Sequence, residues 1–334
     1  MSAFGNGNRR SFLAIAAACL CSARLSRIVA KQTPATASAP VPSRIRSRRY
    51  SVQATVMLGS IPLFTKSGVG GALLTLEESG TPEYGAIALQ FGAGTWPDRL
   101  KGFNRFGATQ EIVRLDHGHL AESSYYAIMT SSREANLSQA EQAFRSPTHS
   151  LLLTVGSGTS TAAGCSARVE HKAVPAACSW SDCPQLMREL REQKSPPLRA
   201  SPAVAAPSAQ GVSCPLCAAR QQPVLPTFLY AVRQAILSGR SDASARYTHN
   251  GEIYTLTTQS HMANRSTQTA ITARICRDDS HAQSEFRVWM ASDSDSELPL
   301  RIEFRAKTYL KLTLELDERQ TIPVFKPILA ETES

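Results

Sequence analysis

The chain has 334 residues and a formal net charge of +9, which would suit a nucleic-acid-binding protein if the charge lay on its folded part. Residues 1–49 hold nine of the 36 lysines and arginines and no acid, so the remainder balances 27 basic residues against 27 acidic ones. We therefore expect no nucleic-acid partner, and the length allows one or two domains with a sizeable core.

The basic start of the chain is typical of an export leader. Arg9 and Arg10 precede Phe12 and a short apolar run that ends near Cys21. The run is too short to span a bilayer, so residues 1–30 are predicted to be a removable signal peptide, and the mature chain no transmembrane span. The paired arginines resemble the twin-arginine signal of bacteria, which implies the export machinery as a partner and a periplasmic or secreted protein.

An organelle-targeting peptide is the alternative to that leader. The first 76 residues contain no acid and are rich in arginine and serine, as transit peptides are. Residues 31–48, rich in proline, alanine and serine, are predicted to be a disordered linker under either hypothesis.

Residues 49–144 are predicted to form the first half of a β domain. Apolar residues alternate from Tyr50 to Leu58, and a turn at Gly59 lets residues 61–66 pair back. The glycines at 68–71 lack the Gly-Lys-Ser/Thr end of a phosphate loop, so they indicate a turn or bulge. Further strands are expected around 87–93, 110–115 and 125–130, and a short helix over 138–144.

Two histidines, His117 and His119, stand two apart beside a glycine between two of these strands. One strand face could present both to a metal ion, but no third ligand is in register. We expect a solvated turn there.

Residues 145–226 are predicted to be a low-complexity, cysteine-containing insertion. Regular periodicity fades, apart from one helix with Pro184 in its first turn. Cys214 and Cys217 have the spacing of half a zinc site or of a redox pair, but a zinc ribbon needs two such pairs. In an exported protein these thiols are expected to form disulfides or stay free, so no metal site is predicted.

Residues 227–317 are predicted to form the second half of the β domain, followed by a polar tail over 318–334. Thr227 can cap a helix over 228–238. Asn250-Gly251 between two alternating stretches is typical of a tight hairpin. Strands are also expected around 267–276 and from Glu285 onward.

The last hairpin has the most regular pattern in the chain. From Leu300 to Leu316 apolar residues fall at even positions, so one face lies in a core and the other in water. Pairing Phe304 with Leu310 keeps that face together and leaves residues 306–308 as the loop. We expect this face to pack against the helix over 228–238. The fold class is therefore mainly β (α+β), a large curved antiparallel sheet or half-barrel with one or two packed helices.

The stretch from Trp289 to Asp295, followed by Pro299-Leu300-Arg301-Ile302, resembles a family of bacterial exported proteins, the domain of unknown function 3108. The resemblance covers roughly 50–74 and 227–317. Ser294 between Asp293 and Asp295 and the long insertion depart from that family. Because the family has no assigned activity, the resemblance implies an exported β-rich protein and no chemistry.

No catalytic residue is predicted, and no cofactor. Gly-x-Ser-x-Gly and His-Glu-x-x-His motifs are missing, and Gly156-Ser157-Gly158 lies in the insertion, so a hydrolase is disfavoured. The leading hypothesis is a non-enzymatic envelope protein that holds an apolar or lipid-like ligand in its curved sheet. The alternative is an interaction module that binds an envelope protein with the insertion as its arm. An enclosed cavity would favour the first, a filled core the second. The candidate ligand-binding residues are Trp289, Asp293, Asp295 and Arg301.

Overall fold

The computed structural model describes most of the chain from β1 to the C-terminal segment. The described residues are 44–96, 98–99, 105–130, 150–175, 177–192, 223–238, 240–262, 268–278, 283–291 and 297–329. The proposed leader with Arg9 and Arg10, the expected helix over 138–144, and Cys214 and Cys217 lie outside them.

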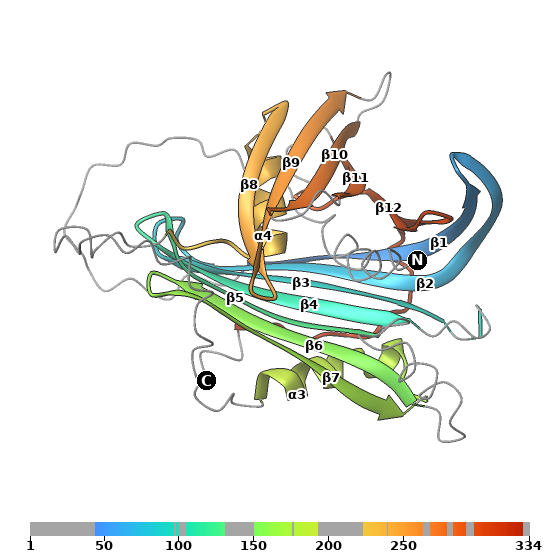
Figure 1. Ribbon diagram of the computed structural model, residues 1–334, viewed down its shortest axis with the longest axis horizontal. Helices are drawn as coiled ribbons and strands as arrows, with labels where there is room; N and C mark the ends of the chain where they lie inside the picture. Colours follow the sequence, from blue (N-terminus) through green and yellow to red (C-terminus); the bar gives the residue numbers. More distant parts are fainter. Residues whose placement is uncertain are drawn as a thin grey trace, which may run out of the picture.

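The described strands form one 13-stranded antiparallel sheet in the order β7-β6-β5-β4-β3-β2-β1-β13-β12-β11-β10-β9-β8 (Figure 1). Most neighbours in space are neighbours in sequence, and only the β1–β13 pair joins distant parts of the chain. The strands are β1 Arg44–Leu58, β2 Ile61–Gly80, β3 Gly85–Thr95, β4 Phe106–Asp116, β5 His119–Thr130, β6 Ser150–Thr161, β7 Gly164–Pro175, β8 Asp242–His249, β9 Glu252–Met262, β10 Gln268–Arg277, β11 Gln283–Ala291, β12 Arg301–Lys307 and β13 Leu310–Leu316.

The sheet curls into a nearly closed barrel with one unsealed seam, so the predicted fold class is confirmed. The two edge strands, β7 and β8, do not pair with each other. Side chains close part of the seam instead. The Tyr125 hydroxyl donates to Asn250 Oδ1 at 2.9 Å and accepts from the Asn250 backbone N–H at 2.7 Å.

Helix α4 (Phe228–Leu237) lies inside the curve of the sheet. It contacts β8 and β9 at one end of the sheet order and β4 in the other half of the sheet. Nearly every residue of α4 is buried, in one apolar cluster with the inward side chains of β1–β3 and β8–β13. Apart from Arg233, which is paired with Glu78, and the exposed Gln234, α4 is apolar, so most of its surface belongs to the core of the barrel.

A second apolar layer covers the outer face of β3 to β6. It consists of a short 3-10 turn (Trp180–Asp182), helix α3 (Cys183–Glu192) and residues 317–329, which we call the C-terminal segment. Trp180 is fully buried against Gly92 and Gly94 of β3, where a Cβ atom would lie 2.7 Å and 2.6 Å from its side chain. The missing side chains of these glycines make room for the indole.

The prediction of little regular structure over 145–226 is wrong for its first half. Strands β6 and β7 extend the sheet, and α3 packs on it. The predicted helix near Pro184 is confirmed, although Ser179 and Asp182 form its capping box. The sequence of β6 gave no apolar alternation, so the strand was not predicted. Its inward face has glycines instead of apolar side chains, because Tyr125 and Asn250 occupy the space above them.

The predicted boundaries of the linker and the tail are wrong too. β1 begins at Arg44, within the stretch expected to be a linker. In the expected polar tail, Ile322, Phe325, Ile328 and Leu329 are buried against the outer face of the sheet. Single apolar residues spaced by polar ones resemble a solvated tail in sequence, but they fill separate sites on a wide sheet.

The final hairpin keeps its predicted faces but not its predicted register. Phe304 opposes Leu312 rather than Leu310, and Ile302 opposes Leu314. The turn is two residues long, and an irregularity at Ala306 absorbs the difference. A two-residue shift preserves the alternation, so the same side chains stay inside. Ile302, Phe304 and Leu314 share the buried cluster of α4, but the nearest strands to α4 are β8, β9 and β4.

The shorter turns follow their sequence signals. Asn250 and Gly251 have φ values of 53° and 77°, as the predicted tight hairpin requires. His117 lies in the β4–β5 turn with Gly118 and has a positive φ of 49°, so the expectation of a turn is confirmed. Gly68, at φ 66°, lies in β2 beside a bulge against β1.

Candidate functional site

The structure brings two of the four candidate binding residues together. Trp289 of β11 and Arg301 of β12 are direct cross-strand neighbours. The Arg301 guanidinium carbon lies 5.0 Å from the centroid of the Trp289 ring, within cation–π range. Asp293 and Asp295 lie outside the described residues. Glu297, which follows them, is buried and forms an ion pair with Arg46.

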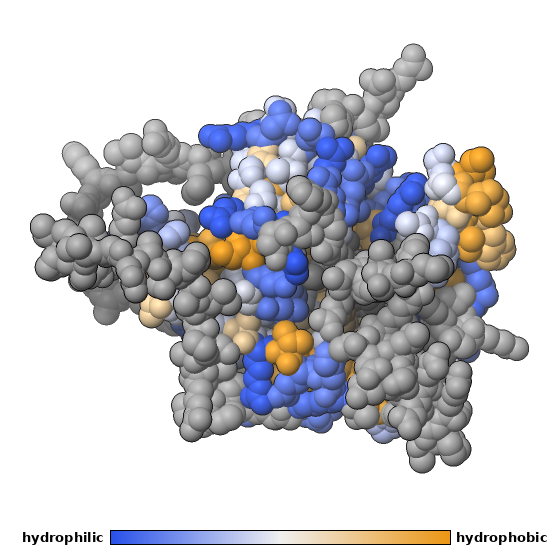
Figure 2. All heavy atoms as spheres, viewed as in Figure 1, coloured by the Kyte–Doolittle hydropathy of each residue, from blue (hydrophilic) through white to orange (hydrophobic). Residues whose placement is uncertain are grey.

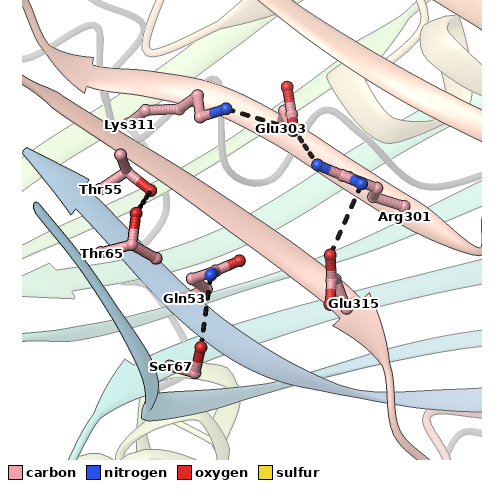
Figure 3. Close-up of polar contacts among 8 residues, drawn as sticks. All are labelled: Gln53, Thr55, Thr65, Ser67, Arg301, Glu303, Lys311 and Glu315. Atoms are coloured by element: carbon pink, nitrogen blue, oxygen red, sulfur yellow. Dashed lines mark hydrogen bonds and ion pairs between the residues drawn. The ribbon is translucent and has the colours of Figure 1, made fainter. Parts of the chain in front are cut away.

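Arg301 belongs to a charged network on the outer face of the sheet (Figure 3). Its guanidinium contacts Glu303 on the same strand and lies 3.6 Å from Glu315 Oε1 on β13. Lys311 Nζ lies 3.4 Å from Glu303 Oε1 on the other side. Two cations thus flank Glu303, whose side chain is only 14% exposed, while the Arg301 side chain is 41% exposed. We call these four residues and Trp289 the outer charged face.

The alternation of β12 and β13 produces this arrangement. Odd-numbered residues point away from α4, and the register places Arg301 opposite Glu315 and Glu303 opposite Thr313. Opposite charges on cross-strand neighbours favour each other, so the pairing of the hairpin fixes the network.

Uncharged polar contacts continue the outer charged face across β1 and β2. Thr55 and Thr65 share a hydroxyl–hydroxyl hydrogen bond of 3.1 Å, and Gln53 Nε2 donates to Ser67 Oγ at 3.3 Å (Figure 3). The polar contacts of the outer face therefore extend over four strands, although Thr55 itself is buried.

The outer charged face has the chemistry of recognition rather than of catalysis. It contains cations, carboxylates and an aromatic ring but no nucleophile beside a base. Among the described residues, no group of three or more histidine, cysteine, aspartate and glutamate side chains could hold a metal ion. The Arg301–Glu315 pair is the more exposed part of the network, and exposed ion pairs contribute about 0–1 kcal/mol each to stability.

A buried ionisable cluster near the seam was missed by sequence reasoning. Glu111 of β4 accepts the backbone N–H groups of Leu229 and Tyr230 at 2.9 Å and 3.1 Å, and so caps α4. Thr227, the expected cap, makes no such side-chain bond. Burial raises the pKa of Glu111 to about 7, although these hydrogen bonds act in the opposite direction. Its sequence signal is an acid at a core-facing position, two residues before the buried Val113.

Aromatic side chains and a histidine surround this cap. Tyr125 stacks on His249 with ring centroids 4.7 Å apart, and Tyr247 stacks on Tyr254 at 5.2 Å. Burial lowers the pKa of His249 to about 4 and raises the pKa of Tyr125 and of Tyr247. The side chains are engaged in closing the seam, so the cluster is structural.

The remaining sequence candidates have structural positions. Gly156-Ser157-Gly158 lies within β6 rather than on a strand-to-helix turn, so it lacks the geometry of a nucleophile elbow. Burial raises the pKa of the Cys183 thiol, which disfavours the reactive thiolate. No described helix is long and apolar enough to cross a membrane.

Comparisons with known proteins add little to this picture. No family model matches the chain, so its likeness to the domain of unknown function 3108 stays a resemblance. No curated protein matches it either. Among solved structures, it is similar to a β-barrel-like protein of the domain of unknown function DUF1849 from Brucella abortus. The identity is 7%, the match covers 83% of this chain and 98% of that one, and the TM-score of 0.33 is too low to carry an argument.

Proposed function

We propose that this chain is a non-enzymatic binding module of the cell envelope, which recognises a protein partner through the outer charged face. The stacked pair of Arg301 and Trp289 carries the proposal. Arginine and tryptophan are enriched among the residues that dominate interface energetics. Their stacking and cross-strand pairing hold both side chains in place, so a partner would lose little binding energy in ordering them.

The buried helix inside the sheet favours this function over the carriage of an apolar ligand. Such a ligand would have to occupy the inner face of the sheet, where α4 packs. An interaction module needs no cavity. The proposed partner-binding arm is now limited to residues 193–222, since α3 ends at Glu192 and the chain from residue 223 packs near β5 and β6.

Site-specific photocrosslinking tests the binding face. A benzoylphenylalanine replaces Arg287, which is exposed and lies opposite Glu303. The control places it at Val324, which is 76% exposed on the C-terminal segment. We expect a defined crosslinked protein at position 287 only, which disappears when Arg301→Glu is added. The same product at both positions, or no effect of Arg301→Glu, would contradict the assignment.

The location in the cell envelope rests on the predicted leader, residues 1–30, which holds four basic residues and no acid. Replacing Arg9 and Arg10 by lysine should leave precursor in the cytoplasm if the twin-arginine route is used. Normal processing of that variant would reduce the proposal to general secretion. An uncleaved, cytoplasmic wild-type chain would refute export.

A further inference from the structure

Large apolar side chains gather at the far end of the β1–β2 hairpin. Among the residues that the structure describes, eleven large hydrophobic side chains are exposed, and six of them lie there. Their exposed fractions run from 38% to 65%. We call this group the apolar tip, and it consists of Val56, Leu58, Ile61, Leu63, Phe64 and Tyr309.

The geometry makes the apolar tip one continuous surface. Leu58 pairs with Ile61 and Val56 with Phe64, so these four side chains share one face of the hairpin. Tyr309, in the β12–β13 turn, is tied to it by a 2.8 Å hydrogen bond from the Met57 N–H to the Tyr309 carbonyl. Figure 1 shows the hairpin curling away from the body of the sheet, and Figure 2 shows its end as an apolar area.

The apolar tip projects because β2 is much longer than its partner on the other side. Among the described strands, β3 pairs with β2 only from Gly70 onward. Residues 61–69 therefore have β1 as their single strand neighbour. The hairpin therefore extends beyond the end of β3, with its large apolar side chains exposed.

The charged residues nearest the apolar tip along the chain are basic. No charged residue occurs from Ala54 to Thr65, and Lys66 follows directly. The facing β12–β13 hairpin contributes the exposed Arg305, whereas Lys311 is paired with Glu303. A basic collar around an apolar end is complementary to an anionic surface with an apolar interior.

We propose that the apolar tip docks on the surface of an anionic lipid bilayer. Aliphatic side chains and Phe64 enter the boundary between headgroups and acyl chains, and Tyr309 lies at the level of the headgroups, where its ring and hydroxyl both find partners. Lys66 and Arg305 face the lipid phosphates. The edge of residues 61–68, which has no strand neighbour other than β1 among the described strands, keeps insertion shallow, because its peptide groups need water or headgroups as partners.

This inference goes beyond the proposed function and does not depend on it. The outer charged face can bind a protein whether or not the apolar tip binds lipid. The variants that test the two proposals change different residues, Arg301 for the outer charged face and Leu58, Phe64 and Lys66 for the apolar tip and its surroundings.

Flotation of the full chain with vesicles tests the docking. One set of vesicles is pure phosphatidylcholine, and the other is an equal mixture with phosphatidylglycerol. We expect wild type to bind the anionic vesicles, and Leu58→Asp and Phe64→Asp each to weaken binding by about tenfold or more. Val324→Asp, at an exposed apolar residue outside the tip, is the matched control and should bind as wild type does. The leader is present in all of them, so differences report the tip.

Two further measurements complete the test. Lys66→Glu should weaken binding to the anionic vesicles and leave binding to neutral ones unchanged. In Leu58→Trp, the fluorescence emission of the introduced tryptophan should shift to shorter wavelength with anionic vesicles only. Wild-type binding by both aspartate variants, or no binding of wild type, overturns the proposal. Loss of self-association in sedimentation with unchanged vesicle binding would also overturn it, and would make the tip a contact between copies of the chain.

Discussion

Two regions of the same sheet differ in how their outer faces are covered. Over β3 to β6, Trp180, α3 and the C-terminal segment bury the outer surface, whereas over β11 to β13 the outer charged face is open. Both regions cover their inner faces with the cluster that contains α4. The difference follows from the outward residues. Glycines and apolar side chains need cover, and paired charges do not.

Removing the Trp180 side chain, the largest in the outer layer, should cause the largest loss of stability. Trp180→Ala leaves a cavity between α3 and the glycines of β3, so we expect the free energy of unfolding to fall by about 3–5 kcal/mol. Urea denaturation measures the loss. Val324→Ala, at an exposed residue of the same layer, should change it by less than about 0.5 kcal/mol. Equal effects would mean that the outer layer does not contribute to the fold.

The inner face of the open region provides the second comparison. Leu314 is fully buried, so Leu314→Ala should cost about 2–5 kcal/mol. Leu312 lies half-buried on the same face, so Leu312→Ala should lower the free energy of unfolding by less. Lys311→Ala on the outer face should have little effect. Thermal denaturation gives the order. Similar losses at Leu314 and Lys311 would show that the two faces are assigned wrongly.

Enlarging a buried residue of α4 tests whether the interior is full. Ala231 is 0% exposed, and Ala231→Phe should destabilise the protein by about 1–3 kcal/mol through overpacking. Ala231→Ser serves as a small-residue control for the helix itself. A neutral or stabilising effect of the phenylalanine would reveal unfilled space beside α4.

The pH dependence of stability should separate the two buried ionisable groups at the seam. The pKa of Glu111 rises from 4.5 to about 7 on folding, so its contribution is present below pH 4.5 and is lost as the pH rises through 7. The pKa of His249 falls from 6.5 to about 4, so its contribution is present above pH 6.5 and is lost as the pH falls through 4. The opposite slopes cancel between about pH 4.5 and 6.5.

Single substitutions should reveal the contribution of each group to the pH dependence. Each group changes the free energy of unfolding by about 1.4 kcal/mol per pH unit within its range. Glu111→Gln removes one slope, so stability should then fall more steeply than in wild type on acidification below pH 6.5. His249→Gln should make stability fall more steeply as the pH rises from 4.5 to 7. Urea midpoints across this range provide the comparison. Parallel curves for all three proteins would contradict these roles.

The sequence predicted those parts of the fold where local pattern and tertiary context agree. Alternation in β12 and β13, the Asn250-Gly251 turn and the apolar helix α4 each carry their own signal. β6 and the C-terminal segment carry no such local signal, because their residues fit partners that are distant in the sequence. Gly156, for example, makes room for Asn250, almost a hundred residues away.

The candidate site was predictable in the same partial way. Trp289 and Arg301 were found through a resemblance, but their stacking depends on the β11–β12 register. Glu111 was missed because its partners are N–H groups of a helix more than a hundred residues further along the chain. An acid between apolar residues shows only that something must satisfy it, not what does.

Native mass spectrometry of the purified chain tests the central claim that α4 fills the barrel and that binding occurs outside it. We expect the mass of the processed polypeptide alone, with no stoichiometric apolar molecule, for wild type and for Leu58→Asp. A lipid bound at one copy per chain in both proteins, and released only on unfolding, would place a ligand inside the sheet and contradict the account.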